Sequence, residues 1–392
     1  MKKPVIKTSI KKTSEVNLMN QFSQQKSFEH GKKERVGILM VQLGTPDAPE
    51  PQAVRRYLKQ FLSDPRVVEI PKLIWWVILN GIILNTRPKK SAAKYRSIWT
   101  KEGSPLMVNS KAQAKLLQGY LGERGHDVIV ALAMRYGNPG IPEVMKQLRE
   151  KNVTKLLILP MYPQYASATT ATGMDEVFRE LAGWRNQPEL RTIRSFHKDP
   201  GYINALALQV RKHWEREQAA SGRGDLLLLS FHGVPERSLH LGDPYHCECY
   251  VTARLLAEKL EIDPKQIKVT FQSRFGKAKW LEPYTDATLK ALPGQGVVKI
   301  DVMCPGFVSD CLETLEEIAI EGKETFMHAG GKEYRYIPCV NDSPVFIKGL
   351  ADLCEQHFGA WPTRRLEPAE EKTRAQSLAL QKQAAQRLGA KQ

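Results

Sequence analysis

The chain has 392 residues, of which 42% are hydrophobic and 26% are charged, a balance typical of a globular enzyme with two or three domains. Its net charge is +16, but 10 of these charges come from residues 1–33 and 361–392, which have the composition of polar tails. The body of the chain is therefore only mildly basic, which argues against a nucleic-acid-binding protein.

Targeting signals give little support to export. The first 30 residues hold no apolar stretch of the kind found in a secretory signal, and no segment reaches the roughly 18 apolar residues of a membrane span. Six irregularly spaced cysteines do not form a disulfide framework. We expect a cytoplasmic protein.

Strand-like and helix-like stretches alternate along the chain, which predicts an α/β fold with mainly parallel sheet. The predicted strands are 36–43, 127–134, 155–161, 226–230, 268–273 and 297–303. The predicted helices are 109–124, 140–151, 172–183, 200–219, 246–260, 309–321 and 343–358.

The first long apolar stretch after the opening strand is "LIWWVILNGIIL", residues 73–84, bounded by Pro71 and Pro88. It fits a buried core helix. It equally fits an exposed apolar segment, which we call the lip. Paired Trp residues followed by Arg87, Lys89 and Lys90 suit a membrane interface or a hydrophobic ligand. Both interpretations stay open at this point.

Two pairs of segments suggest an internal repeat. "GILMVQLGTP" is similar to "LLLLSFHGVP", and "LLILPMYPQY" is similar to "KIDVMCPGF". The first copy is longer, and residues 57–105 are the natural candidate for the insertion. We therefore predict two similar α/β halves with a ligand cleft between them.

Common nucleotide and hydrolase motifs are missing from the sequence. The first strand is not followed by G-x-G-x-x-G, and the chain contains neither G-x-x-x-x-G-K-[ST], nor G-x-S-x-G, nor H-E-x-x-H. These absences exclude the usual dinucleotide, NTP, serine hydrolase and zincin interpretations.

The most informative residue is His232, which ends a predicted strand, where ligands usually bind in α/β folds. A second informative stretch, "CPGFVSDCLETLEEIAIEG", begins a helix that Ser309 or Asp310 is expected to cap. With α-helical spacing, Asp310, Glu313 and Glu317 share one face, with Glu316 beside them. These groups either form a solvated acidic face or join His232 in binding a divalent cation transiently and taking up protons.

Other side chains carry weaker signals. His240, His246, Cys247 and Cys249 lie close in sequence, but on one helix the two cysteines point apart, which disfavours a zinc site. The hydroxyl-rich stretch 160–177 suits an anion or ordinary capping. Trp280, within a basic segment, suits a flat anionic ligand or the core.

Six stretches, taken in order, resemble the ferrochelatases, which insert Fe²⁺ into a porphyrin. They are "GILMVQLGTP", "YRSIWTKEGSPL", "LPMYPQYASATT", "LLSFHGVPERSLHLGDPY", "FQSRFGKAKWLEPYTD" and "PGFVSDCLETLEEI", within residues 35–358. The resemblance implies two Rossmann-like, doubly wound halves around a porphyrin cleft. It divides the chain into a basic disordered N-terminal tail (1–33), a first half (34–187) with the lip insertion (57–105), a second half (188–340), a C-terminal helix that packs back on the first half (341–360) and a polar tail (361–392).

The resemblance also implies roles for individual residues. His232 would bind the incoming metal or accept a pyrrole proton, and Glu313 would be its partner carboxylate. Residues of the acidic face would relay protons or metal: Asp310, Glu316 and Glu317. The macrocycle would contact Tyr162, Trp280 and Phe307, and its propionates would lie near Arg87, Ser104 and Arg274.

The implied substrates are Fe²⁺ and protoporphyrin IX, with coproporphyrin III or another tetrapyrrole as the alternative. The resemblance implies no tightly bound cofactor. A [2Fe–2S] cluster of the animal type is not expected, because the chain has no cysteine beyond Cys354. We expect a monomer that binds no nucleic acid, with peripheral membrane contact through residues 73–84 left open.

Overall fold

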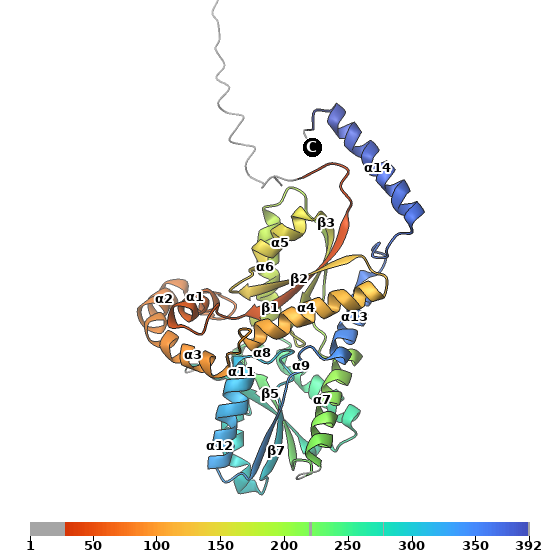
Figure 1. The fold of residues 1–392 in the computed structure, drawn as a ribbon. Coiled ribbons are helices and arrows are strands. Elements are labelled where there is room, and N and C mark those ends of the chain that lie inside the picture. Colours follow the sequence, from red (N-terminus) through yellow and green to blue (C-terminus); the bar gives the residue numbers. More distant parts are fainter. Residues whose placement is uncertain (1–27, 219–221, 277, 391–392) are drawn as a thin grey trace, which may run out of the picture.

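The structure, a computed structural model, describes residues 28–218, 222–276 and 278–390. It contains two four-stranded sheets with parallel pairing throughout, one in each half of the molecule (Figure 1). The first sheet has the order β2 (Val128–Tyr136), β1 (Arg35–Gly44), β3 (Val153–Pro160) and β4 (Glu189–Thr192), and the second has the order β6 (Ile267–Gln272), β5 (Leu226–His232), β7 (Lys299–Met303) and β8 (Glu333–Ile337). The two orders correspond strand for strand, which confirms the predicted pair of similar halves.

Two strands, β4 and β8, were not predicted from the sequence. Each is a sheet edge, and "ELRT" and "EYRYI" lack the continuous apolar run of the buried central strands. Because β4 pairs with β3, the first half extends past the predicted boundary at residue 187 to at least Thr192.

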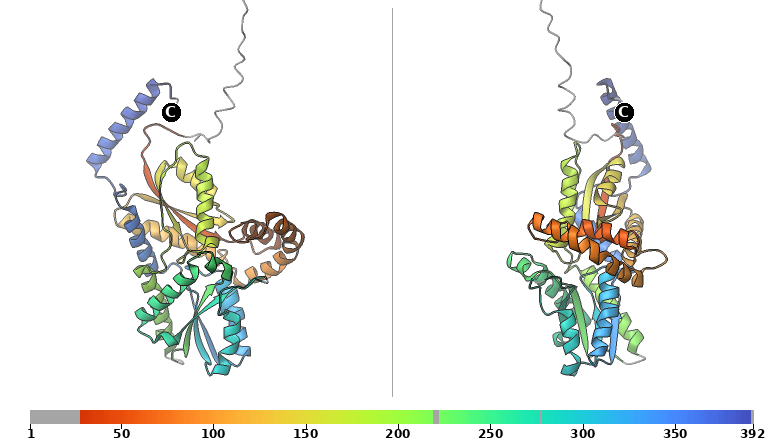
Figure 2. Two further views of the ribbon diagram at one scale, coloured as in Figure 1. Left: turned by 180° about the vertical axis from the view of Figure 1, so that it is seen from behind. Right: turned by 90° about the vertical axis from the view of Figure 1, so that its left-hand side faces the viewer.

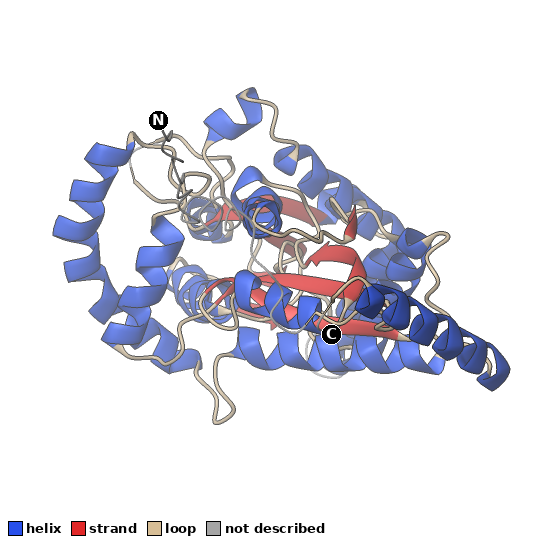
Figure 3. Ribbon diagram, turned by 90° about the horizontal axis from the view of Figure 1, so that it is seen from above, coloured by secondary structure: helices blue, strands red, loops and turns tan. Residues whose placement is uncertain are grey.

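Helices cover both faces of each sheet (Figure 3). One face of the first sheet packs on α5 (Ile141–Glu150) and α6 (Thr172–Ala182). The corresponding face of the second sheet packs on α10 (Thr285–Ala291), α12 (Lys323–His328) and the π-helical segment η5 (Leu315–Gly322). The remaining faces share one continuous core with α4 (Pro105–Glu123), α7 (Pro200–Gln218), α9 (Tyr245–Leu260) and α13 (Pro344–Phe358). Thus α13, from the end of the second half, contacts α4 of the first half.

The inserted segment forms four helical pieces that project from the side of the first half (Figure 2). They are α1 (Pro51–Leu62), α2 (Lys72–Ile78), the π-helical segment η1 (Leu79–Ile83) and α3 (Leu84–Ile98). Trp75 faces inward and its indole N–H donates to the Leu62 carbonyl at 2.6 Å. Leu73 and Trp76 are 85% and 65% exposed. The lip is therefore exposed rather than a core helix, and no helix in the described part of the chain is long and apolar enough to cross a membrane.

The terminal segments lie together at one end of the molecule. Residues 1–27 of the predicted N-terminal tail lie outside the described residues, while Lys33 pairs with Asp127 and Glu371. The polar C-terminal segment contains α14 (Pro368–Arg387), a helix that stands apart from both sheets (Figure 1). This helix was not predicted, because it is polar on all sides and therefore shows no apolar periodicity.

Candidate active site

The carboxyl ends of the two sheets meet in the middle of the molecule. Gln164, just after β3, donates from its side-chain amide to Thr252 on α9 at 2.9 Å and to the Pro305 carbonyl after β7 at 3.3 Å. Gln113 on α4 donates to the carbonyls of Val308 and Asn341 at 3.0 and 2.8 Å. These contacts bring residues that follow the strands of both halves into one region, as expected for an α/β ligand site.

His232 is the last residue of β5 and is half-buried. Its Nδ1 lies 2.6 Å from the Gly233 carbonyl oxygen. Because a carbonyl oxygen only accepts, Nδ1 carries the proton of the neutral ring, and Nε2 keeps a lone pair. The Phe307 ring lies 6.4 Å from the imidazole, centroid to centroid. His232 is thus held in the tautomer that suits a metal ligand or a base.

Gly233 permits the close approach of the strands on which this geometry depends. A Cβ added there would lie 2.7 Å from the Gln272 carbonyl oxygen and 3.1 Å from the Trp280 ring. Trp280 pairs through its backbone with Pro235, and its indole N–H is buried without a partner. The glycine after the histidine therefore lets Gln272 and Trp280 pack closely against the end of β5.

The acidic helix begins later than predicted. Its first helical residue is Leu312, and Cys311, rather than Ser309 or Asp310, is the N-cap. The Cys311 amide donates to Thr314 at 2.9 Å. After this single α-turn (α11, Leu312–Thr314) the chain continues as the π-helix η5, so α-helical spacing does not decide which carboxylates share a face.

Asp310 does not lie on that face. Its carboxylate is buried and accepts from the Tyr336 hydroxyl at 2.5 Å, the Asn341 amide at 2.7 Å and the Thr314 hydroxyl at 3.1 Å. The prediction that Asp310, Glu313 and Glu317 line one helix face is wrong for Asp310, because this residue precedes the helix. Its carboxylate anchors the start of the helix instead.

Glu317 lies close enough to His232 and to Glu313 for the charges of both to act on its carboxylate. The Gln272 amide donates to the Glu313 carbonyl at 2.7 Å, and Ser273 donates to Glu317 from its backbone at 2.7 Å and its hydroxyl at 2.5 Å. Burial raises the pKa of Glu317, and the charge of Glu313 adds to this effect, while Ser273 and His232 oppose it. The three side chains thus form one electrostatically coupled group.

Glu316 belongs to a separate contact. It is buried and pairs with Lys94 of α3 at 2.9 Å, and Lys94 also contacts Glu321 at 2.6 Å. Burial raises the pKa of Glu316, an effect that Lys94 opposes and Glu321 reinforces. The residues of the predicted acidic relay are therefore separated. Glu317, the inner member, interacts with His232, whereas Glu316, the outer member, joins the lip to the second half through Lys94.

Two tyrosines near this group were missed by the sequence analysis. Tyr57 and Tyr95 are buried, and their rings lie 6.5 Å apart. The charge of Glu313 contributes to a raised pKa of both hydroxyls. Burial raises the pKa of each, so both stay protonated. Arg87 of α3 also interacts electrostatically with Glu313, and its guanidinium lies 5.2 Å from the Phe275 ring. No short motif marks these tyrosines, because their proximity to Glu313 arises only in the folded chain.

The remaining residues predicted to contact the ring or its propionates differ in their surroundings. The Tyr162 hydroxyl is buried without a partner, and burial raises its pKa. Arg274 is exposed and lies over the Tyr284 ring at 4.5 Å. Ser104 is buried at the start of α4, where its carbonyl accepts from Val108 at 3.0 Å. Among the three, Tyr162 carries a fully buried hydroxyl that lacks a hydrogen-bond partner.

Within the described residues, neither the cysteines nor the His232 group forms a cluster of three metal ligands. All six cysteines are free thiols, and Cys247 is exposed while Cys249 is buried, as their opposite helix faces require. In the described part of the chain, no three His, Cys, Asp or Glu side chains gather in a way that could hold a metal ion.

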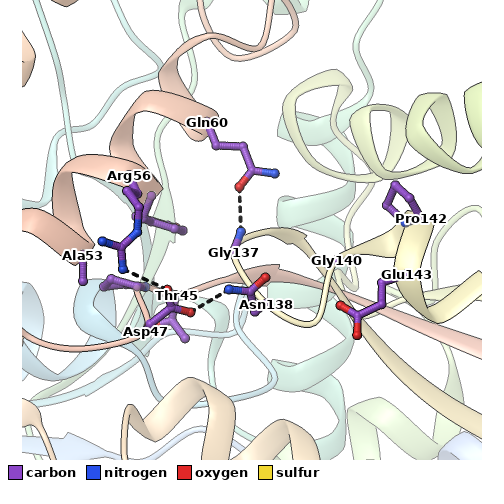
Figure 4. A pocket seen from close by; sticks show the side chains of 12 residues that line it. Thr45, Asp47, Ala53, Arg56, Gln60, Gly137, Asn138, Gly140, Pro142 and Glu143 are labelled. Atoms are coloured by element: carbon purple, nitrogen blue, oxygen red, sulfur yellow. Dashed lines mark hydrogen bonds and ion pairs between the residues drawn. The ribbon is translucent and has the colours of Figure 1, made fainter.

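A polar cavity of about 410 Å³ lies apart from His232, beyond the ends of β1 and β2 (Figure 4). Asp47 accepts from Arg56 at 3.3 Å and from Asn138 at 2.9 Å, and Gln60 accepts from the Gly137 amide at 2.8 Å. Its polar groups are thus largely paired with one another. Tyr57 lines this cavity as well, and the charge of Glu313 contributes to its raised pKa.

Comparisons with known proteins agree with this geometry. A family model of ferrochelatase matches residues 35–358. Ferrochelatase from Chromobacterium violaceum is 56% identical over 355 residues, which cover 90% of this chain and 96% of that protein. Ferrochelatase from Dechloromonas aromatica is 57% identical over 346 residues, covering 88% and 94%. Among solved structures, SirB from Bacillus subtilis with Fe³⁺ aligns with a TM-score of 0.50 at 10% identity, over 84% of this chain and 99% of that one, which is a likeness of fold.

Proposed function

The chain belongs to the ferrochelatase family, and we propose that it inserts Fe²⁺ into protoporphyrin IX, yielding protohaem and two protons. The observation that carries the proposal for the site is the tautomer of His232. Its Nδ1–H is held by the Gly233 carbonyl, which leaves the lone pair on Nε2, and the charges of His232 and Glu313 both act on Glu317. An imidazole lone pair that shares an electrostatic environment with carboxylates suits both halves of the reaction, which are metal transfer and proton removal.

The reaction exchanges two pyrrole N–H protons for one Fe²⁺ ion. His232 serves either as a ligand that passes the metal to the ring or as the base for a pyrrole proton, and Glu313 is its partner in both cases. Glu317 has a raised pKa, which makes its carboxylate a better proton acceptor than an ordinary glutamate. We assign the inner relay step to Glu317 and the outer step to Glu316.

Macrocycle contacts are proposed for the residues around this group. Tyr162, Trp280 and Phe307 would hold the faces of the ring, and the buried indole N–H of Trp280 and hydroxyl of Tyr162 are polar groups without protein partners. Arg87, on the lip, would meet a propionate, because its charge already acts near Glu313. Propionate contacts for Ser104 and Arg274 rest on the sequence resemblance. We propose no tightly bound cofactor, with iron entering as a substrate.

The residues that contact the faces of the porphyrin would supply the binding energy that strains the substrate. Fe²⁺ reaches the pyrrole nitrogens only when the ring bends out of its plane, and contacts with the faces and propionates can supply the energy for that distortion. The apolar lip favours protoporphyrin IX, with two carboxylates, over coproporphyrin III, with four.

We also propose that the lip contacts a membrane surface peripherally. Leu73, Trp76 and Val77 are 85%, 65% and 61% exposed, and exposed Lys72 and Lys89 flank this patch. Apolar side chains of this kind beside basic ones suit the interface of an anionic bilayer. Flotation with anionic vesicles should recover the wild type, and Leu73→Glu with Trp76→Glu should abolish recovery. Recovery of the double variant with the vesicles would contradict the proposal.

Anaerobic iron insertion tests the central proposal. Purified protein is mixed with Fe²⁺ and either protoporphyrin IX or coproporphyrin III, and the loss of porphyrin fluorescence is followed. We expect rapid insertion into protoporphyrin IX, and loss of this activity in His232→Ala and Glu313→Gln. His240→Ala and Glu324→Gln are matched controls, because both residues are exposed. Faster insertion into coproporphyrin III would reassign the substrate, and no insertion into either porphyrin would refute the function.

A further inference from the structure

Glu248 is a buried carboxylate for which the proposed reaction has no use. It lies on α9 in the second half and is 6% exposed. Its Oε2 accepts from the Tyr165 amide at 2.7 Å, and its Oε1 accepts from the Arg194 guanidinium at 3.0 Å. His197 Nδ1 lies 3.1 Å from Oε2. All three partners come from the first half or from the link between β4 and α7, so Glu248 joins the two halves.

Neighbouring contacts tie the same loop to the same helix. The Ser167 amide donates to Asp243, just before α9, at 2.7 Å. The Gln164 side chain donates to Thr252, one turn after Glu248, at 2.9 Å. Residues 164–167 are therefore attached to α9 at three points.

This attachment spans the candidate active site. The loop follows β3 and begins with Met161 and Tyr162, whose hydroxyl is buried without a partner. Helix α9 follows β5, which ends on His232. The contact between loop and helix therefore sets how the carboxyl end of the first sheet sits against that of the second.

We propose that Glu248 is a positioning residue for metal insertion, holding the loop that carries Tyr162 in place against the half that carries His232. The inference rests on the proposed function. A carboxylate is needed because both of its oxygens accept hydrogen bonds. In Glu248→Gln the amide nitrogen cannot accept, so either the Tyr165 or the Arg194 hydrogen bond is lost. Burial raises the pKa of Glu248, but His197, Tyr165 and Arg194 outweigh burial and lower it overall, so the group stays ionised.

The test separates positioning from general stability. Wild type, Glu248→Gln and Asp243→Asn are compared for kcat, for the KM for protoporphyrin IX and for the midpoint of thermal unfolding. Asp301→Asn is the matched control, because Asp301 is a 1% exposed carboxylate that accepts from Trp214 and Arg335, both at 2.7 Å, away from the site. All rates are measured well below the unfolding midpoints.

We expect kcat of Glu248→Gln to fall at least about tenfold while KM changes by less than about threefold, because misplacement acts on the transition state. Asp243→Asn should show a smaller loss of the same kind, and this half-buried position carries the test if Glu248→Gln fails to fold. Asp301→Asn should lose stability yet keep kcat within about twofold.

Two results would overturn the inference. One is an unchanged kcat in Glu248→Gln, or in Asp243→Asn if that variant carries the test. The other is a fall in kcat that follows the unfolding midpoint equally in Glu248→Gln and Asp301→Asn. A wild type that inserts no iron would instead refute the proposed function, so the two failures are distinguishable.

Discussion

Gly233→Ala tests whether the close approach of β5 and β6 positions His232. The added Cβ would lie 2.7 Å from the Gln272 carbonyl oxygen, which belongs to a paired strand and cannot rotate aside. The Gly233 amide also donates to that carbonyl at 2.8 Å, so relief of the clash distorts this hydrogen bond. Overpacking of this kind costs about 1–3 kcal/mol of the free energy of unfolding.

The same displacement should reduce catalysis. The Gly233 carbonyl accepts from His232 Nδ1 at 2.6 Å, so movement of Gly233 turns the imidazole. A misplacement of about 1 Å can cost roughly 10²-fold in rate, and a shift of a few tenths of an ångström should cost about tenfold.

Urea unfolding and anaerobic iron insertion measure the two effects. Gly119→Ala is the control, because Gly119 is exposed on α4 and an added Cβ there meets nothing within 4 Å. It should stabilise the protein by about 0.5–1 kcal/mol without affecting the rate. The reasoning would be refuted if Gly233→Ala lost stability but kept the wild-type rate, or if it matched the wild type in both.

Three further predictions follow from burial and charge. As the pH falls through the raised pKa of Glu317, its carboxylate is protonated and insertion should slow; Glu317→Gln should lack this acidic limb, and an unchanged pH–rate profile would exclude Glu317 as a proton acceptor. Asp301→Asn should lower the free energy of unfolding by about 3–5 kcal/mol at neutral pH, because it removes the buried carboxylate that pairs with Arg335. The pKa of Asp301 is lowered in the folded state, so the ionised carboxylate stabilises the fold above the unfolded-state pKa. This contribution is lost as the pH falls through the folded-state pKa, and the urea unfolding curves of variant and wild type should therefore converge in acid. Trp75→Ala should cost about 3–5 kcal/mol, whereas Trp76→Ala, at a 65% exposed position, should stay within about 0.5 kcal/mol; equal losses in thermal unfolding would contradict the orientation of the lip.

The central strands and the repeat were predictable because they depend on local composition. A strand buried on both faces favours a continuous apolar run, which β1, β3 and β5 have, while β7 keeps apolar residues on either side of Asp301. The edge strands β4 and β8 escaped because a sheet edge needs no such run. The helix α14 escaped because a helix that is polar on all sides has no apolar stripe to detect.

The roles of the candidate site residues stay predictions, but their surroundings can be compared with the expected ones. His232 was chosen for its position at a strand end, and Glu313 for its place on the acidic helix and for the family resemblance; in the structure the charges of both act on Glu317. Asp310 was misplaced, because α-helical spacing was applied to a residue that precedes the helix and to a segment that continues as a π-helix. Tyr57 and Tyr95 were missed because nothing in their local sequence distinguishes them from core tyrosines.

By itself, the sequence determined the α/β class, the paired halves, the histidine at the end of a buried strand and the likeness to ferrochelatases. Each of these depends on side-chain polarity and order along the chain, which are local properties. Tertiary structure alone decided that the lip is exposed, that Asp310 is enclosed while Glu317 is coupled to His232, and that Glu248 joins the halves. These features arise from contacts between residues far apart in the chain, and no local pattern encodes the balance of burial and hydrogen bonding that selects them.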